Sequence, residues 1–227
     1  MTVALAALPY RRTLLGAPLA HWALGGGAFA FALLVNYWTG SYVDRIGPSL
    51  APARDLLFEH LPLRAFPFVH SWGFVAFLAV FSLGTALHER ERTPFFLWAF
   101  ALIIGTRAVF TVLTPLGVPV EAPTFDGFPL RSVFRYFDFR YTFFFSGHTA
   151  YPLLGALLAR RPWVRWCCLG VSLMLASSVL LSRLHYSVDV AGAIFITFAV
   201  AGFAKRSWRR AVRVGRAPSS PDPALGR

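Results

Sequence analysis

The chain has 227 residues, of which 56% are hydrophobic, 16% aromatic and only 14% charged. This composition excludes an ordinary soluble domain, in which about half of the residues are apolar and about a quarter are charged. The formal net charge of +12 would suit a nucleic-acid partner, so its distribution along the chain has to be considered.

Apolar segments of about 20 residues, the length that crosses the hydrocarbon core of a bilayer, recur along the chain. A soluble helical bundle is the competing interpretation, but segments this long and this poor in charge argue against it. The sequence therefore predicts an all-α fold, a six-span transmembrane helical bundle. In chain order the predicted spans are Ala20–Trp38, Phe66–Leu87, Phe95–Thr114, Phe143–Ala159, Val164–Leu181 and Val188–Ala204.

Basic residues gather in the segments that lie on one side of the membrane if six spans alternate. The loops on the other side balance arginine against aspartate and glutamate. The positive-inside rule therefore predicts that the N- and C-termini are both cytoplasmic. The basic residues of this side are Arg11, Arg12, Arg90, Arg92, Arg160, Arg161, Arg165, Lys205, Arg206, Arg209, Arg210, Arg213, Arg216 and Arg227.

The predicted spans form one membrane unit, and no internal repeat is found in the sequence. We expect a cytoplasmic segment over residues 1–19, a membrane domain over residues 20–204 and a basic, disordered cytoplasmic tail over residues 205–227. The tail suits anionic lipid at the membrane surface better than nucleic acid, so no nucleic-acid partner is expected. The sequence does not indicate an oligomeric state.

Two longer loops are predicted on the outward side, at about residues 40–65 and 115–142. Residues 54–61 alternate polar and apolar side chains at helical spacing, which fits a short interfacial helix and a plain connecting loop equally well. His60 and His70 are expected near the same side, but their spacing does not recommend them as site residues.

Two polar motifs lie where predicted spans meet outward loops: Ser146–Thr149 (SGHT) and His185–Asp189 (HYSVD). Ionisable groups are costly in hydrocarbon, and those that a membrane protein keeps are functional by default. Because both motifs fall on the same predicted side, we expect one site built at the starts of two helices.

The second motif has the residue types needed for attack on phosphorus. His185 and Asp189 are four positions apart and share a helix face, and a carboxylate on one imidazole nitrogen leaves the other free to attack. Arg183 precedes His185 by two positions, and a guanidinium matches phosphate oxygens with paired donors.

The first motif has groups that complete such a site. Ser146 offers a hydroxyl, Gly147 permits close backbone approach, and His148 is a second imidazole. Helix N-termini also favour anions through their N–H groups and the helix dipole. The two motifs together predict a phosphate pocket with two histidines, one to attack and one to protonate a leaving oxygen.

Each motif also has other interpretations. A lone SGHT segment is commonly a loop-to-helix junction, and a lone His-x-x-x-Asp pair is commonly a hydrogen bond on a helix surface. Two histidines and an aspartate could hold iron or zinc, but no second carboxylate has fitting spacing and Arg183 would repel a cation, so no metal or other cofactor is expected. A transporter or proton relay would favour ionisable groups near mid-bilayer and inverted repeats.

The motifs resemble the catalytic motifs of sphingomyelin synthases and related lipid headgroup transferases, within the type-2 phosphatidic-acid phosphatase superfamily. The segments that carry this resemblance are Phe145–Thr149 and His185–Val190. Residues 52–59 and 113–119 are similar to two further family segments, so the likeness covers about residues 50 to 200.

The resemblance implies a role for each site residue. His185 would be the nucleophile, Asp189 its orienting partner and His148 the acid for the departing diacylglycerol. The headgroup of a membrane phospholipid would pass through a phosphohistidine to a lipid hydroxyl or to water, without a metal because arginines and helix dipoles meet the charge. Six spans and an active site on the extracytoplasmic side are also implied.

The chain departs from the family pattern near the first motif. Synthases usually have an acidic residue four places before the motif's serine, where this chain has Thr142, so the headgroup stays open. The Arg-Pro motif that the phosphatase branch has before SGH is missing. Its phosphate-binding role falls to Arg107, Arg131, Arg135 or Arg140; proximity favours Arg140 and the family likeness favours Arg107.

The sequence thus predicts an integral membrane lipid phosphotransferase that moves a phospho-headgroup between lipids. The alternative is a lipid phosphate phosphatase of the same superfamily, which hydrolyses phosphatidic acid or a related lipid phosphate. Transfer is preferred on the family likeness at Thr149 and Tyr186. A protein that only binds lipid phosphate would need Arg183 and the fold, but not two histidines and an aspartate.

Overall fold

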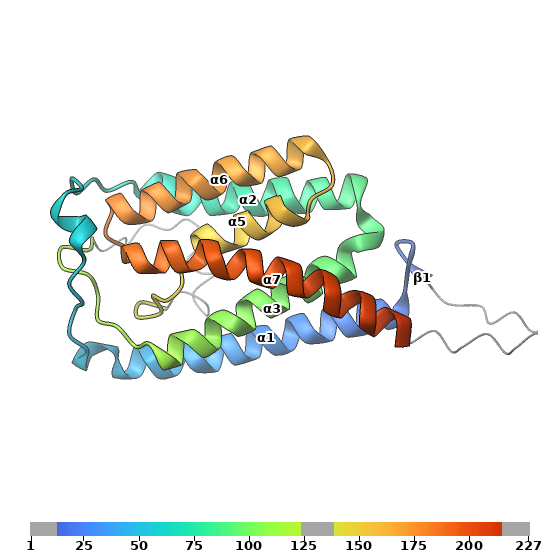
Figure 1. Cartoon of the computed structure of the whole chain (residues 1–227), viewed down its shortest axis with the longest axis horizontal. Helices are drawn as coiled ribbons and strands as arrows, with labels where there is room; N and C mark the ends of the chain where they lie inside the picture. Colours follow the sequence, from blue (N-terminus) through green and yellow to red (C-terminus); the bar gives the residue numbers. More distant parts are fainter. Residues whose placement is uncertain (1–12, 124–138, 215–227) are drawn as a thin grey trace, which may run out of the picture.

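The computed structural model describes residues 13–123 and 139–214, and over these ranges the chain is an all-α bundle (Figure 1). This confirms the predicted fold class. Within the described part, six α-helices are found, five of them long and apolar enough to cross a membrane. The helices are α1 (Leu19–Ile46), α2 (Pro67–His88), α3 (Thr93–Leu113), α5 (Gly147–Leu158), α6 (Pro162–Leu181) and α7 (Ser187–Val214).

Short elements connect these helices. Strands β1 (Thr13–Leu14) and β2 (Ala17–Pro18) form a small antiparallel ladder before α1. Three 3-10 helices follow: η1 (Gly47–Ser49), η2 (Leu56–Glu59) and η3 (Arg90–Arg92). Of the two interpretations for residues 54–61, the structure therefore has a short helix, and its length is one turn.

Proline sets the beginning of three of the long helices. Pro67, Pro94 and Pro162 each lie in the first turn of their helix. A proline is tolerated there because its missing N–H would have no helical partner and its fixed φ suits a helix. The observed beginnings of α2, α3 and α6 accordingly lie within two residues of the predicted ones.

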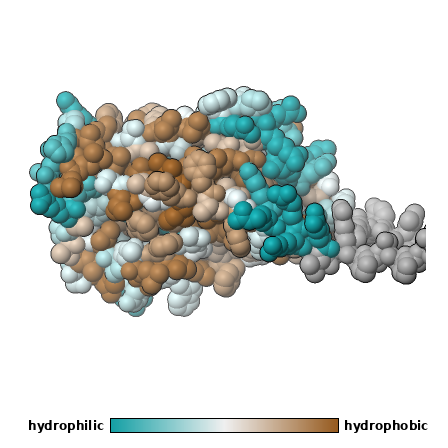
Figure 2. Space-filling view, viewed as in Figure 1, coloured by the Kyte–Doolittle hydropathy of each residue, from teal (hydrophilic) through white to brown (hydrophobic). Residues whose placement is uncertain are grey.

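The outer surface of the bundle is apolar between two polar ends. Phe31, Trp38 and Phe195 are 69%, 73% and 75% exposed. Figure 2 shows hydrophobic residues over the middle of the molecule and hydrophilic residues gathered towards the ends. Exposed apolar surface on this scale is unfavourable in water and favourable in lipid, which agrees with a membrane-embedded bundle.

Helix α5 differs from the others because it is short and central. Its 12 residues extend about 18 Å, less than the ~30 Å hydrocarbon core. It packs against α2, α3, α6 and α7, and its residues Ala150 and Leu154 are fully buried. The predicted span Phe143–Ala159 thus becomes a loop followed by an interior helix, whose backbone ends are surrounded by protein.

Helix α7 extends ten residues beyond its predicted end. The expectation that the disordered tail begins at residue 205 is wrong for residues 205–214, which are helical. Trp208 explains this, because its ring packs 6.3 Å from that of Trp98, whose Nε1 donates to Ser207 Oγ at 3.0 Å. Residues 215–227 lie outside the described part of the chain.

Candidate active site

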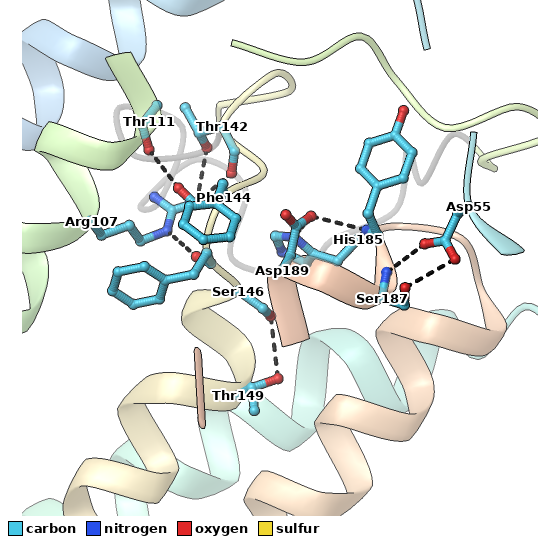
Figure 3. Close-up of polar contacts among 12 residues, drawn as sticks. Asp55, Arg107, Thr111, Thr142, Phe144, Ser146, Thr149, His185, Ser187 and Asp189 are labelled. Atoms are coloured by element: carbon cyan, nitrogen blue, oxygen red, sulfur yellow. Dashed lines mark hydrogen bonds and ion pairs between the residues drawn. The ribbon is translucent and has the colours of Figure 1, made fainter. Parts of the chain in front are cut away.

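The structure brings the two polar motifs together at the starts of α5 and α7. Ser146, which precedes α5, donates its backbone N–H to the carbonyl oxygen of Asp189 at 3.1 Å. The ring centroids of His148 and His185 are 6.3 Å apart. The two helix starts therefore share one site, in which Figure 3 shows Ser146, His185 and Asp189 close together.

His185 and Asp189 form the pair that their spacing predicts. His185 Nδ1 lies 3.2 Å from Asp189 Oδ2, which also accepts the backbone N–H of Tyr186 at 2.9 Å (Figure 3). Asp189 is fully buried and His185 is only 7% exposed. Because the carboxylate holds the Nδ1 side of the ring, Nε2 is the nitrogen left to act as a nucleophile.

His148 is enclosed by side chains of α2 that the sequence did not recommend as site residues. Its ring centroid lies 4.2 Å from that of His70 and 5.3 Å from that of Phe74. His70 and Phe74 are four positions apart and so share one face of α2. The position of His70 just after an outward loop was the signal in the sequence that could have indicated a site residue. The contact of His70 with His148 of α5 depends on the tertiary structure.

Arg107 on α3 holds the loop that leads into the first motif. Its Nε donates to the carbonyl oxygen of Phe145 at 2.9 Å, and its Nη2 donates to the carbonyl and, at 3.1 Å, to the hydroxyl of Thr142 (Figure 3). Thr111, one turn further along α3, donates to the carbonyl of Phe144 at 3.3 Å. Arg107 thus positions Ser146 through the backbone before it and brings a positive charge to the site.

The first motif itself is tightly packed. Ser146 is fully buried, and its Oγ accepts the Thr149 hydroxyl at 3.3 Å (Figure 3). A Cβ on Gly147 would lie 3.1 Å from the ring of Tyr151, tighter than most such contacts. A side chain at this position would therefore crowd the helix start against Tyr151.

The phosphate-binding candidates differ in their surroundings. Arg183 pairs with Glu121 and donates from Nη2 to the carbonyl of Phe58 at 3.1 Å. An anionic headgroup that binds Arg183 would therefore have to share the guanidinium with Glu121 or displace the Glu121 carboxylate. Arg140 is exposed, and its backbone N–H donates to Asp44 of α1 at 3.2 Å; Arg131 and Arg135 lie outside the described residues.

The start of α7 is capped by a carboxylate from a distant loop. Asp55 Oδ2 accepts the backbone N–H of Ser187 at 2.6 Å, and Oδ1 accepts the Ser187 hydroxyl at 3.0 Å (Figure 3). The same Oδ1 accepts Leu57 N at 2.9 Å and caps η2. The negative charge that the α7 dipole favours is thus supplied by the protein itself.

Tyr186 joins the two loops that resemble further family segments. Its hydroxyl donates to the carbonyl of Gly117 at 2.8 Å and accepts the backbone N–H of Ala53 at 3.0 Å. A Cβ on Gly117 would lie 2.4 Å from the carbonyl oxygen of Leu50, so only glycine fits there. Burial raises the pKa of the Tyr186 phenol above its ordinary value of 10.0, which keeps it protonated as a donor.

Comparison with protein-family models finds a match between residues 143–206 and the PAP2 superfamily C-terminal model. No curated protein and no solved structure matches the chain significantly. The matched region, about a quarter of the chain, contains both motifs and the whole of α5 and α6. Residues 143–206, which carry both motifs, are thus similar to the C-terminal part of the PAP2 superfamily, whose members are typically phosphatases or phosphotransferases.

Proposed function

We propose that the chain is a lipid phosphotransferase that moves a phospho-headgroup from a membrane phospholipid to a lipid hydroxyl through a phosphohistidine at His185. The observation that carries this proposal is the neighbouring pair of imidazoles: His148 and His185 have ring centroids 6.3 Å apart, with Asp189 on Nδ1 of His185. A phosphorus atom between the rings would meet a nucleophile on one side and an acid on the other.

In the first half-reaction, His185 Nε2 attacks phosphorus. The new N–P bond forms as the P–O bond to diacylglycerol breaks, and protonated His148 donates its proton to the leaving oxygen. The positive charge that develops on the His185 ring is balanced by the buried carboxylate of Asp189. Diacylglycerol leaves, and the headgroup stays on His185.

In the second half-reaction, the hydroxyl oxygen of the acceptor attacks phosphorus. Neutral His148 takes the hydroxyl proton, the N–P bond breaks, and both histidines return to their starting states. The phosphoryl oxygens would lie near the start of α5, where the helix dipole and the guanidinium of Arg107 offset their charge. The chemistry proposed needs no metal.

Enclosure of His185 supports a lipid acceptor rather than water. The rings of Phe143 and Tyr186 lie beside the site, 5.7 Å apart, and the Phe143 ring is 6.1 Å from that of His185. Apolar walls limit the access of water to a reactive intermediate. Hydrolysis by a phosphatase shares the first half-reaction and differs only in the acceptor. The distribution of basic residues supports a site on the extracytoplasmic side.

The test is to follow lipid products in liposomes that contain the purified protein. Labelled phosphatidylcholine, phosphatidylethanolamine, phosphatidylinositol and phosphatidic acid would each be supplied with and without ceramide. The native chain is expected to transfer one headgroup to the acceptor, and His185→Ala is expected to transfer none. His60→Ala is the matched control, because His60 is an exposed histidine of the outward loop.

Each other result has a definite meaning. Release of phosphate or headgroup with no transfer would assign the chain to the phosphatase branch. Equal turnover by His185→Ala would disprove the nucleophile, and the absence of any product over this panel would count against an enzyme.

A further inference from the structure

A second charged cavity lies at the end of the bundle opposite the histidines. It has a volume of about 570 Å³ and lies among η3, the end of α5, the beginning of α6 and the last turns of α7. Along α7, Lys205 is about 24 Å from Asp189, at 1.5 Å per residue. The cavity is therefore not part of the candidate active site.

The charges that line this cavity are mostly positive. Arg92, Arg160, Arg165, Lys205 and Arg209 line it together with one carboxylate, that of Glu91. Arg92 also pairs with the carboxylate of Glu89, so the five cations meet two carboxylates and a net positive charge remains. An anion that enters the cavity reduces the repulsion among the remaining cations. Figure 2 shows hydrophilic residues gathered at this end of the molecule, next to the apolar middle.

The cavity also has an apolar wall. Phe95, Leu157, Leu158 and Trp208 line it beside the basic residues. The guanidinium of Arg92 lies 5.3 Å from the centroid of the Phe95 ring, so charged and apolar groups are in direct contact. A ligand with an anionic head and an apolar body matches this combination better than a free ion does.

Three of the cations have a structural role at the end of α5. Lys205 Nζ, Arg92 Nη2 and Arg165 Nη2 donate to the carbonyl oxygens of Leu157, Leu158 and Ala159, at 3.4, 3.3 and 3.1 Å. These are the carbonyls that a helix end leaves without helical partners. A guanidinium has five N–H donors and a carbonyl takes one or two, so these bonds orient the cations and leave donors for a phosphate.

We propose that this cavity binds the phosphate-bearing headgroup of an anionic phospholipid in the leaflet opposite the catalytic histidines. The headgroup phosphate would contact Lys205, Arg209 and Arg160, and the glycerol end would lie on Phe95 and Trp208. This site does not depend on the proposed catalytic function, so either proposal can be wrong without affecting the other.

The test compares two pairs of substitutions on the same helix. Lys205→Gln with Arg209→Gln removes two charges that line the cavity, and Arg206→Gln with Arg210→Gln removes two exposed charges from the next face of α7. Binding to the delipidated full chain in neutral detergent would be measured by native mass spectrometry and by thermal stabilisation. The probes are short-chain phosphatidic acid, phosphatidylglycerol, phosphatidylcholine and, separately, inorganic phosphate.

We expect the native chain to bind the two anionic lipids more tightly than phosphatidylcholine or inorganic phosphate. The cavity pair should weaken this binding by about tenfold or more, and the control pair by about twofold or less. If both pairs weaken the binding of anionic lipid equally, the lipid is attracted only by the general positive charge of the surface, and the proposed site is wrong. Equal affinity for inorganic phosphate would overturn the lipid assignment.

A second comparison keeps the proposal testable if the double variant does not fold. Arg160→Gln removes a charge that lines the cavity, and Arg161→Gln removes an adjacent exposed charge that does not line it. The backbone N–H of Arg160, which donates to Glu89 at 2.8 Å, stays in place in both variants. Weaker binding of anionic lipid by Arg160→Gln alone supports the site, and unchanged binding overturns it.

Discussion

Asp189 has a carboxylate that is fully buried, which is costly unless neighbouring groups compensate the charge. Its Oδ2 contacts His185 Nδ1 and accepts Tyr186 N, whereas its Oδ1 has no hydrogen-bond partner among the described residues. The carboxylate can therefore stabilise a positive charge on the His185 ring. We therefore expect its charge, and not only its shape, to matter for turnover.

Asp189→Asn tests that conclusion. The amide keeps the volume and one oxygen but loses the charge, so we expect turnover to fall by about 10²- to 10⁴-fold while the protein stays folded. Headgroup turnover in liposomes measures the first effect, and thermal unfolding in detergent measures the second. Turnover within about twofold of the native rate would show that the charge is not needed.

His70 is expected to position His148 through ring contact. His70→Ala should lower kcat by about tenfold or more without raising KM, because His148 gains room to move. His70→Phe keeps a ring against His148 and should restore most of the turnover. If phenylalanine restores nothing, the ring nitrogens of His70 take part, and the positioning role is wrong.

At the scale of elements, the start of α7 is held by two loops and not by the helix alone. The loop before η2 supplies Asp55 to Ser187 and Ala53 to Tyr186, and the loop after α3 supplies Gly117 to Tyr186. Tyr186 is therefore the point where three segments of the chain meet beside the site.

Tyr186→Phe removes the hydroxyl and leaves the Gly117 carbonyl and the Ala53 N–H without it. Unsatisfied buried groups of this kind cost about 1–3 kcal/mol each, so we expect about 2 kcal/mol or more of lost stability. Thermal unfolding in detergent measures the loss. An unchanged unfolding midpoint would contradict the proposed junction.

The same residue predicts how stability depends on pH. Its pKa is raised by burial, so the stability that the phenol contributes is complete below about pH 10 and is lost as pH rises further, because the unfolded chain releases the proton first. The native chain should therefore lose more stability than Tyr186→Phe as the pH rises from about 9 to about 11, a range centred on the ordinary tyrosine pKa of about 10. If the stability of the native chain and that of Tyr186→Phe fall equally with pH, this prediction is wrong.

At the scale of the whole molecule, the charge distribution predicts the orientation of the bundle in the membrane. The basic residues of η3 and of the last turns of α7 should face the cytoplasm, and the histidines should face outward. A C-terminal epitope should therefore resist protease on sealed cells and be cleaved after permeabilisation. Cleavage on sealed cells would reverse the orientation and both leaflet assignments.

The limits of prediction are visible in particular elements. Apolar length predicted α2, α3 and α6 closely, whereas α5 was predicted as a full span although it begins only at Gly147. Residues 143–145, three phenylalanines, are as apolar as a span, but they form the loop that Arg107 and Thr111 hold from α3. Residues 205–214 are polar enough for a tail, but Trp208 packs them onto the bundle.

The sequence by itself determined the membrane bundle and the pairing of His185 with Asp189. Both follow from local properties. The length of an apolar segment governs its transfer into lipid, and two side chains that are four residues apart lie on the same face of a helix. Only the tertiary structure decided that His70 contacts His148, that Asp55 caps α7 and that Tyr186 joins two loops. These contacts link residues as far as 133 positions apart, and no local pattern specifies which distant segments will meet.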